Sequence, residues 1–315
     1  MHRFISQRRT LLFLVATFAF ISSSNSALSA EPLVWKFTAG DQHYYQMIQE
    51  MQMSMDLGPT GNTETSFKQT MDMVWKVESL NEDGSAKVTQ HFNRIRMDIN
   101  APGQDPVQFD TQSEDAPQGY AAMLAPMMTA LTTDKFTMTM APNGEISNVE
   151  IPKAFTEAIS RGPGAAMMGG FATEEGLKKM AKQGSLTLPT PADLTEGHEW
   201  STSIDIDNPA AGKITIDTTY RYAGAREIDG QQFEIFIPSI NTSFNAEEGD
   251  QAAQIEVTNQ ETTGEILFNR SAGRLESSTI DQKMTNTITV AGNTINQDIT
   301  QKVTFKIIAP EETKE

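Results

Sequence analysis

Apolar and polar residues alternate along much of this chain of 315 residues. The first such stretch has apolar side chains at Tyr45, Met47, Met51, Met53 and Met55. Because successive side chains of a strand point to opposite faces, a period of two indicates a half-buried β-strand. The pattern returns at residues 67–77 and 136–140 and in several stretches after residue 186. We therefore expect a mainly β protein made of antiparallel strands.

Turn signals separate these stretches. Asp83-Gly84, Asn143-Gly144 and Asp229-Gly230 are expected to be tight turns, since Gly adopts the positive φ that such turns need. The apolar phase shifts between Phe92 and Ile95, which predicts a β-bulge at this point.

Two stretches break the period and predict short helices. Residues 120–131 have apolar side chains at helical spacing, and a helix can begin at Pro126 because Pro is favoured in a first turn. Residues 152–184 are expected to form two short helices, the second capped by Thr173. A segment rich in Gly and Met, residues 162–171, joins them.

The order of these elements divides the chain into five parts. The predicted parts are a signal peptide (1–30), an N-terminal β half with a short helix (31–151), a helical Gly/Met-rich insert (152–185), a C-terminal β half (186–309) and a flexible tail (310–315). Each half would form its own antiparallel sheet or half-barrel. Both open on a similar motif, Ala39-Gly40-Asp41 and Glu196-Gly197-His198, so an internal duplication is one interpretation. Two runs of ordinary hairpins are the other.

The first thirty residues have the three-part layout of a secretory signal peptide. Arg3, Arg8 and Arg9 precede an apolar run from Leu11 to Ile21, and small or polar residues follow as far as Ala30. The run is too short to cross a membrane, which takes about 20 residues, so no transmembrane segment is expected after cleavage. The protein is predicted to be periplasmic or secreted. The adjacent arginines leave both the general and the twin-arginine export routes open.

The charge of the chain excludes one class of partner. The three arginines are the only charged residues of the first thirty, so the exported part carries 21 basic and 41 acidic residues. A surface this acidic repels nucleic acid, and we expect no nucleic-acid partner. Because the chain contains no Cys, its stability must come from burial and strand pairing rather than from disulfides.

Methionine is distributed unevenly, with 16 of the 17 residues before position 185. The M-x-M pattern of Met51, Met53 and Met55 admits a copper site, since thioethers are soft ligands that suit Cu(I). An apolar interior built of flexible side chains produces the same pattern, and it is the interpretation we prefer. No metal and no cofactor is assigned.

The Gly-rich segment contains the candidate ligand-binding residues Met167, Met168 and Phe171. An apolar loop of this kind can cover a cavity or contact a partner. A crossover that joins the two β halves is the structural alternative.

No catalytic residue is assigned, because the chain has neither a G-x-S-x-G nor an H-E-x-x-H motif. Asp205 and Asp207 share a strand face and could help to bind Ca²⁺, although a solvated strand end gives the same pattern. Trp35, Trp75 and Trp200 are expected to be anchors of the core or of a sheet edge.

Several short motifs resemble a family of uncharacterised exported bacterial proteins, a domain of unknown function. The motifs are Trp35-Lys36-Phe37 with Gly40-Asp41, Trp75-Lys76-Val77 before residues 83–88, residues 138–146, and Gly197-His198-Glu199-Trp200. The resemblance spans most of the exported chain and implies export and a β-rich fold. It implies no activity.

These observations favour an exported, non-catalytic protein that holds an apolar small molecule or an envelope protein against a Met-rich β interior. Such a carrier would have an apolar cavity of about 300 Å³ or more. Two alternatives stay open. One is a structural or interaction protein without a ligand cavity, and the other is a hydrolase with two carboxylates that face each other across a cleft.

Overall fold

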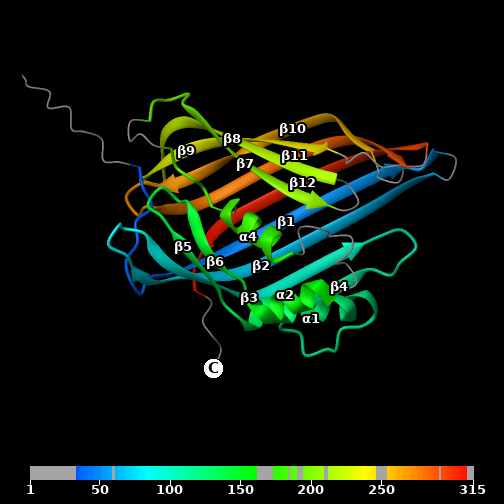
Figure 1. The fold of residues 1–315 in the computed structure, drawn as a ribbon, viewed down its shortest axis with the longest axis horizontal. Helices are drawn as coiled ribbons and strands as arrows, with labels where there is room; N and C mark the ends of the chain where they lie inside the picture. The colour runs from blue at the N-terminus through cyan, green and yellow to red at the C-terminus, as the bar shows by residue number, and fades with distance from the viewer. Residues whose placement is uncertain are drawn as a thin grey trace, which may run out of the picture. The chain divides into compact units, whose positions relative to one another are not determined.

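One large antiparallel sheet dominates the structure, a computed structural model (Figure 1). The structure describes residues 33–58, 61–161, 173–183, 185–189, 194–208, 212–245, 254–290 and 292–310. The strands are β1 (Gln42–Asp56), β2 (Asn62–Leu80), β3 (Ala86–Asn100), β4 (Val107–Asp110), β5 (Phe136–Met140), β6 (Ile146–Glu150), β7 (Glu199–Asn208), β8 (Gly212–Ile228), β9 (Gln231–Asn245), β10 (Gln254–Asn269), β11 (Arg274–Val290) and β12 (Asn293–Ile308). The helices are α1 (Gly119–Thr133), α2 (Lys153–Arg161) and α4 (Glu174–Gln183). The mainly β fold is confirmed.

The first and last strands meet in the middle of the sheet. The order is β6-β5-β3-β2-β1-β12-β11-β10-β9-β8-β7, and β4 pairs with β3 beside β5. β1 and β12 pair from Tyr44–Ile308 to Asp56–Asn296, and Figure 1 shows them side by side in blue and red. Two tandem sheets are therefore not observed. β12 satisfies the backbone groups that β1 would otherwise leave unpaired at an edge. The internal duplication stays a prediction.

Local irregularities follow the sequence signals. Asp72 pairs with Arg94 and Met73 pairs with Phe92, which leaves Asn93 as an extra residue in β3 and confirms the bulge. Asp229 and Gly230 both have positive φ, 50° and 77°, in the turn between β8 and β9.

The helices form near the predicted positions. Pro126 lies inside α1 rather than at its start, so the helix begins earlier than the sequence suggested. The turn before Pro126 forms because Ala121 and Leu124 pack against the apolar face of β3, and this burial offsets the missing N–H group. Thr173 caps α4 as predicted, since its Oγ1 accepts a hydrogen bond of 3.0 Å from the backbone N–H of Gly176. None of the described helices is both long and apolar enough to cross a membrane.

The largest buried cluster surrounds Trp35 at one end of the strands, and we call it the aromatic core. The Trp35 ring packs edge-on against Phe268 with centroids 5.2 Å apart, and its Nε1 donates to the carbonyl of Leu186 at 3.0 Å. Backbone hydrogen bonds tie residues 35 and 36 to Pro142 and Gly273, which belong to opposite halves of the chain. The aromatic core consists of Leu33, Trp35, Val77, Ala86, Val88, Met138, Met140, Ile146, Val149, Leu186, Leu188, Tyr220, Tyr222, Phe236, Ile266 and Phe268. The sheet therefore curves until strands near both of its edges reach the same core.

Candidate functional site

The residues that the sequence proposed for ligand binding cannot be placed. Met167, Met168 and Phe171 lie outside the described residues, so their role stays a prediction. The Met-rich strands predicted from the sequence, β1 and β2, lie in the middle of the sheet.

The side of the sheet that holds the aromatic core continues along β1, β2, β11 and β12. Met47 of β1 lies opposite Met71 of β2 and opposite Phe305 of β12, and paired residues share a face. We define the neutral inner face as every second residue of four segments. These residues are Met47, Gln49, Met51, Met53 and Met55 (β1); Thr63, Thr65, Phe67, Gln69 and Met71 (β2); Ser278, Ile280, Gln282, Met284, Asn286 and Ile288 (β11); and Ile295, Gln297, Ile299, Gln301, Val303 and Phe305 (β12).

All charged residues of these four segments point to the opposite, outer face. They are Glu50, Glu64, Lys68, Asp281, Lys283, Asp298 and Lys302. The Nζ of Lys68 lies 2.9 Å from a carboxylate oxygen of Glu50, and the Nζ of Lys302 lies 3.9 Å from one of Asp281. The neutral inner face therefore consists only of apolar, amide and hydroxyl side chains.

Burial also differs along this side of the sheet. Tyr45 and Phe268 of the core end are almost fully buried, at 1% and 0% exposure, whereas Met51, Met53 and Ile299 are half-buried. Among the described helices, α1 packs mainly on β3 and β4, and α4 on β6 and β7. Within the described chain, neither of these helices packs mainly on the four segments, and much of the neutral inner face is only half-buried.

Asn286 is the exception, because it is buried at 2% exposure. Its Nδ2 donates to Oε1 of Gln297 at 3.1 Å, and Nε2 of Gln297 lies 2.9 Å from the thioether sulfur of Met53. Oδ1 of Asn286 is buried and accepts no hydrogen bond. The neutral inner face thus contains, at Asn286, a buried amide oxygen without a donor. The Thr63 hydroxyl on the same face is also buried without a partner among the described residues.

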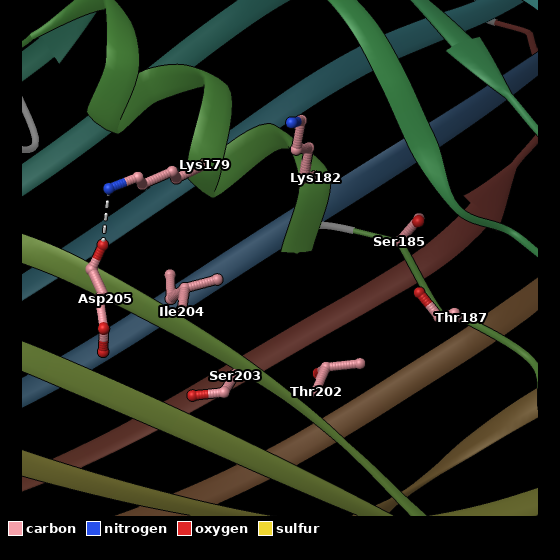
Figure 2. A pocket seen from close by; sticks show the side chains of 8 residues that line it. All are labelled: Lys179, Lys182, Ser185, Thr187, Thr202, Ser203, Ile204 and Asp205. Carbon is pink, nitrogen blue, oxygen red and sulfur yellow. Dashed lines mark hydrogen bonds between the residues drawn. The ribbon is translucent and has the colours of Figure 1, made fainter.

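A pocket of about 490 Å³ lies where α4 meets β7 (Figure 2). Thr202 and Ile204 of β7 line it, and they lie opposite Thr218 and Ile216 of β8. Figure 2 shows Lys179 of α4 at its rim, where its Nζ donates to the backbone oxygen of Asp205 at 3.1 Å. The lining also includes Lys182, Ser185, Thr187 and Ser203. This pocket is larger than a carrier requires. Most of its lining residues carry a polar group, although apolar atoms form the larger part of its surface.

A wider hollow of about 1670 Å³ lies between β3, β4 and α1. Arg94 reaches into it and pairs with Asp110, with Nη2 2.5 Å from Oδ2. The hydrogen bond from Arg94 lowers the pKa of the Asp110 carboxyl below its ordinary value. The charged side chains at this hollow thus neutralise each other in part.

The buried carboxylates are engaged in ion pairs on opposite faces of the sheet. Asp72 faces outward and binds Arg96 at 2.5 Å and Gln46 at 2.8 Å. Glu234 belongs to the core side, where it accepts a hydrogen bond from Tyr222 and lies 2.9 Å from Nε of Arg270. Burial, followed by the Glu234 carboxylate, raises the pKa of the Tyr222 hydroxyl to about 12. These two acids do not face each other as a hydrolase pair would.

The proposed cation ligand Asp205 already has partners. Nζ of Lys213 lies 2.6 Å from its carboxylate, and Oγ1 of Thr215 donates to it at 2.8 Å. The hydrogen bond from Lys213 lowers the pKa of this carboxyl. In the part of the chain that the structure describes, no three His, Cys, Asp or Glu side chains gather closely enough to hold a metal ion.

The tryptophans have the anchoring role that the sequence suggested. Trp35 is buried in the aromatic core. Trp200 packs against that core, and its Nε1 donates to the carbonyl of Thr187 at 2.7 Å. Trp75 packs against Tyr45, with ring centroids 5.5 Å apart.

Sequence comparison gives one family. A family model matches residues 83–275, and its description is a family of unknown function, DUF6263. No curated protein matches the sequence.

Solved structures resemble the chain only distantly. Lipovitellin is 11% identical with a TM-score of 0.45 over 87% of this chain, which spans 26% of the length of lipovitellin. DynF from the dynemicin biosynthesis pathway of Micromonospora chersina is 10% identical with a TM-score of 0.22, and the match covers 91% of this chain and 90% of DynF. An outer membrane channel from Pseudomonas putida F1 is 6% identical with a TM-score of 0.24, and the match covers 87% of this chain and 97% of the channel. At these scores the likenesses do not bear on function.

Proposed function

We propose that this chain, which belongs to the DUF6263 family of unknown function, is an exported, non-catalytic protein that binds an apolar small molecule on its neutral inner face. One observation carries the proposal. All seven charged residues of the four middle segments lie on the outer face, while Met, Ile, Val and Phe side chains, interspersed with uncharged Gln, Asn, Ser and Thr, line a largely half-buried inner face.

The energetics of such a surface support binding. Covering apolar surface contributes about 25 cal/mol per Å² removed from water, and wide exposed apolar patches commonly mark interaction sites. The unbranched side chains of Met51, Met53 and Met55 change shape easily, so the face can adapt to an irregular molecule. A neutral face also imposes no cost of stripping water from a charged side chain.

Two further observations support the rest of the proposal. The layout of the first thirty residues favours export to the envelope or beyond. The buried carboxylates of Asp72 and Glu234 are held in ion pairs, which favours a structural role for both. An envelope protein is the other candidate occupant of the face.

A fluorescent probe tests the proposal on the exported chain. N-phenyl-1-naphthylamine is uncharged and apolar, and its emission rises when it leaves water. Ile299→Asp places a charge on the neutral inner face, whereas Thr300→Asp places the same charge on the outer face of the same strand. We expect Ile299→Asp to weaken binding about tenfold or more, because the bound probe would strip water from the carboxylate. Thr300→Asp should leave binding within about twofold of the parent.

Thermal unfolding of both variants establishes that they are folded before binding is compared. Absence of saturable binding to the parent chain would reject the proposal and favour a structural protein without a ligand cavity. Equal weakening by the two substitutions would place the probe somewhere other than this face. Native mass spectrometry of protein from its own envelope adds an independent measurement, since a lipid-sized mass should accompany the parent and be depleted in Ile299→Asp.

A further inference from the structure

We propose that the molecule bound on the neutral inner face is uncharged and carries a hydrogen-bond donor, a hydroxyl or amide N–H, that meets Oδ1 of Asn286. This inference rests on the proposed function and names the class of ligand. It starts from Oδ1 of Asn286, one of two buried polar atoms on that face that lack a partner among the described residues. The other is the hydroxyl of Thr63, which can donate as well as accept and so does not by itself select a ligand group.

The hydrogen bonds around Asn286 determine which of its atoms is free. Nε2 of Gln297 lies 2.9 Å from the sulfur of Met53, which fixes the donor end of that amide toward the thioether. Oε1 of Gln297 therefore points to Asn286 and accepts from its Nδ2 at 3.1 Å. Oδ1 of Asn286 remains as an acceptor without a donor.

A buried amide oxygen without a partner is uncommon in folded proteins, and such a group calls for a donor. The strand neighbours of Asn286 do not supply one. Val257 lies opposite it on β10, and Ile288 and Met284 are the next residues on its own side of β11. A donor that arrives with a ligand would satisfy the oxygen while the rest of the ligand covers the adjacent apolar side chains.

The absence of charge on the neutral inner face selects against an ionised ligand. A carboxylate or phosphate would lose water there without a Lys or Arg side chain of the four segments to neutralise it. A protonated amine would likewise find no carboxylate on this face. The chemistry that fits is an aliphatic or aromatic body with a hydroxyl or amide group, such as a long-chain alcohol, an acylglycerol or an N-acyl amide.

Three competitors of equal chain length test the inference by displacement of N-phenyl-1-naphthylamine. They are 1-decanol, its methyl ether and decanoate at pH 8. The alcohol has the donor, the ether has only the acceptor, and decanoate is charged. We expect the alcohol to bind roughly fivefold to tenfold more tightly than the ether, the usual worth of one hydrogen bond. Decanoate should bind most weakly.

A matched pair of variants tests whether Oδ1 of Asn286 causes the preference for the alcohol over the ether. Asn286→Leu keeps a similar volume but removes the acceptor, so the ratio of alcohol to ether affinity should fall to about one. Asn296→Leu makes the same change on the outer face, where Asn296 lies opposite Thr287, and should leave the ratio unchanged.

Equal affinity of the parent chain for alcohol and ether would overturn the inference, as would tightest binding of decanoate. Both results need only the parent chain, so they count even if Asn286→Leu does not fold. Either result, obtained while the fluorescent probe still binds, leaves the proposed function intact. Failure of the fluorescent probe itself to bind would reject the proposed function instead.

Discussion

The aromatic core and the neutral inner face occupy the same side of one sheet, yet the chain fills only one of them. β1 runs through both regions with an unbroken period of two, but Tyr45 at the core end is 1% exposed and Met53 is only half-buried. Residues 33–37 and 185–188 cover the core end, whereas α1 and α4 pack mainly on β3, β4, β6 and β7 rather than on the middle strands. Alternation thus identifies an apolar face, but it does not say whether the chain covers that face.

The sharpest contrast between the two regions should come from truncation of large side chains. Phe268→Ala removes a fully buried ring that packs against Trp35, and we expect the free energy of unfolding to fall by about 3–5 kcal/mol. Met53→Ala should cost about 1 kcal/mol or less, because a half-buried side chain leaves no closed cavity. Urea unfolding monitored by circular dichroism measures both.

If Met53→Ala destabilises the protein as strongly as Phe268→Ala, the neutral inner face is part of the closed core, and the distinction fails. Phe268→Leu serves as a milder core variant if the alanine variant does not fold. It should still cost more than Met53→Ala.

Substitution of two glycines tests how residues 185–188 close the core end. Gly144 has a φ of +85°, and a Cβ there would lie 2.2 Å from the carbonyl oxygen of Leu186 and 2.6 Å from Nε1 of Trp35. Gly144→Ala should therefore lower the free energy of unfolding by about 2–3 kcal/mol, through overpacking and strain.

Gly197→Ala is the matched control, because Gly197 has a φ of +90° but no atom within 4 Å of a Cβ. It should cost about 1 kcal/mol, from backbone strain alone. Equal losses for the two variants in urea unfolding would show that residues 185–188 do not pack against the turn as described.

An effect confined to high pH is expected from the buried pair at the core end. Burial and the Glu234 carboxylate raise the pKa of the Tyr222 hydroxyl from 10.0 to about 12 in the folded protein. Between pH 10 and 12 the unfolded chain loses this proton while the folded protein keeps it, so stability should fall across that range.

Tyr222→Phe removes the titrating group, so its stability should fall less steeply over the same range, by up to about 1.4 kcal/mol per pH unit. Guanidine unfolding at half-unit pH steps gives both slopes. Parallel slopes would indicate that Tyr222 ionises in the folded protein at its ordinary pKa.

Much of the fold could be predicted from local pattern. The alternation at residues 45–55 and 67–77, the bulge at Asn93 and the cap at Thr173 depend on residues close together in the chain, and all of them form as predicted. The pairing of β1 with β12 could not be predicted, because it joins residues about 250 positions apart and many edges compete for each strand.

Only part of the candidate site could be predicted from the sequence. Gln49 and Gln69 occupy the same phase as the methionines, and Glu50 and Lys68 occupy the other, so the charge segregation could have been found by examining each face for charged residues. The buried position of Asn286 could not be found in this way. Its surroundings depend on the register of β11 with β12 and on a contact to Met53 in a distant strand.

Nuclear magnetic resonance of ¹³C-methyl-labelled methionine tests the central claim most directly, because methionines occur in every relevant environment. Met51, Met53 and Met55 lie on the neutral inner face, Met138 and Met140 lie in the aromatic core, and Met123 and Met180 are exposed on helices at 49% and 45%. Addition of 1-decanol should shift the methyl signals of the first group and leave those of the core and of the exposed pair in place. Shifts confined to Met123 and Met180, or no saturable shift at all, would contradict the account.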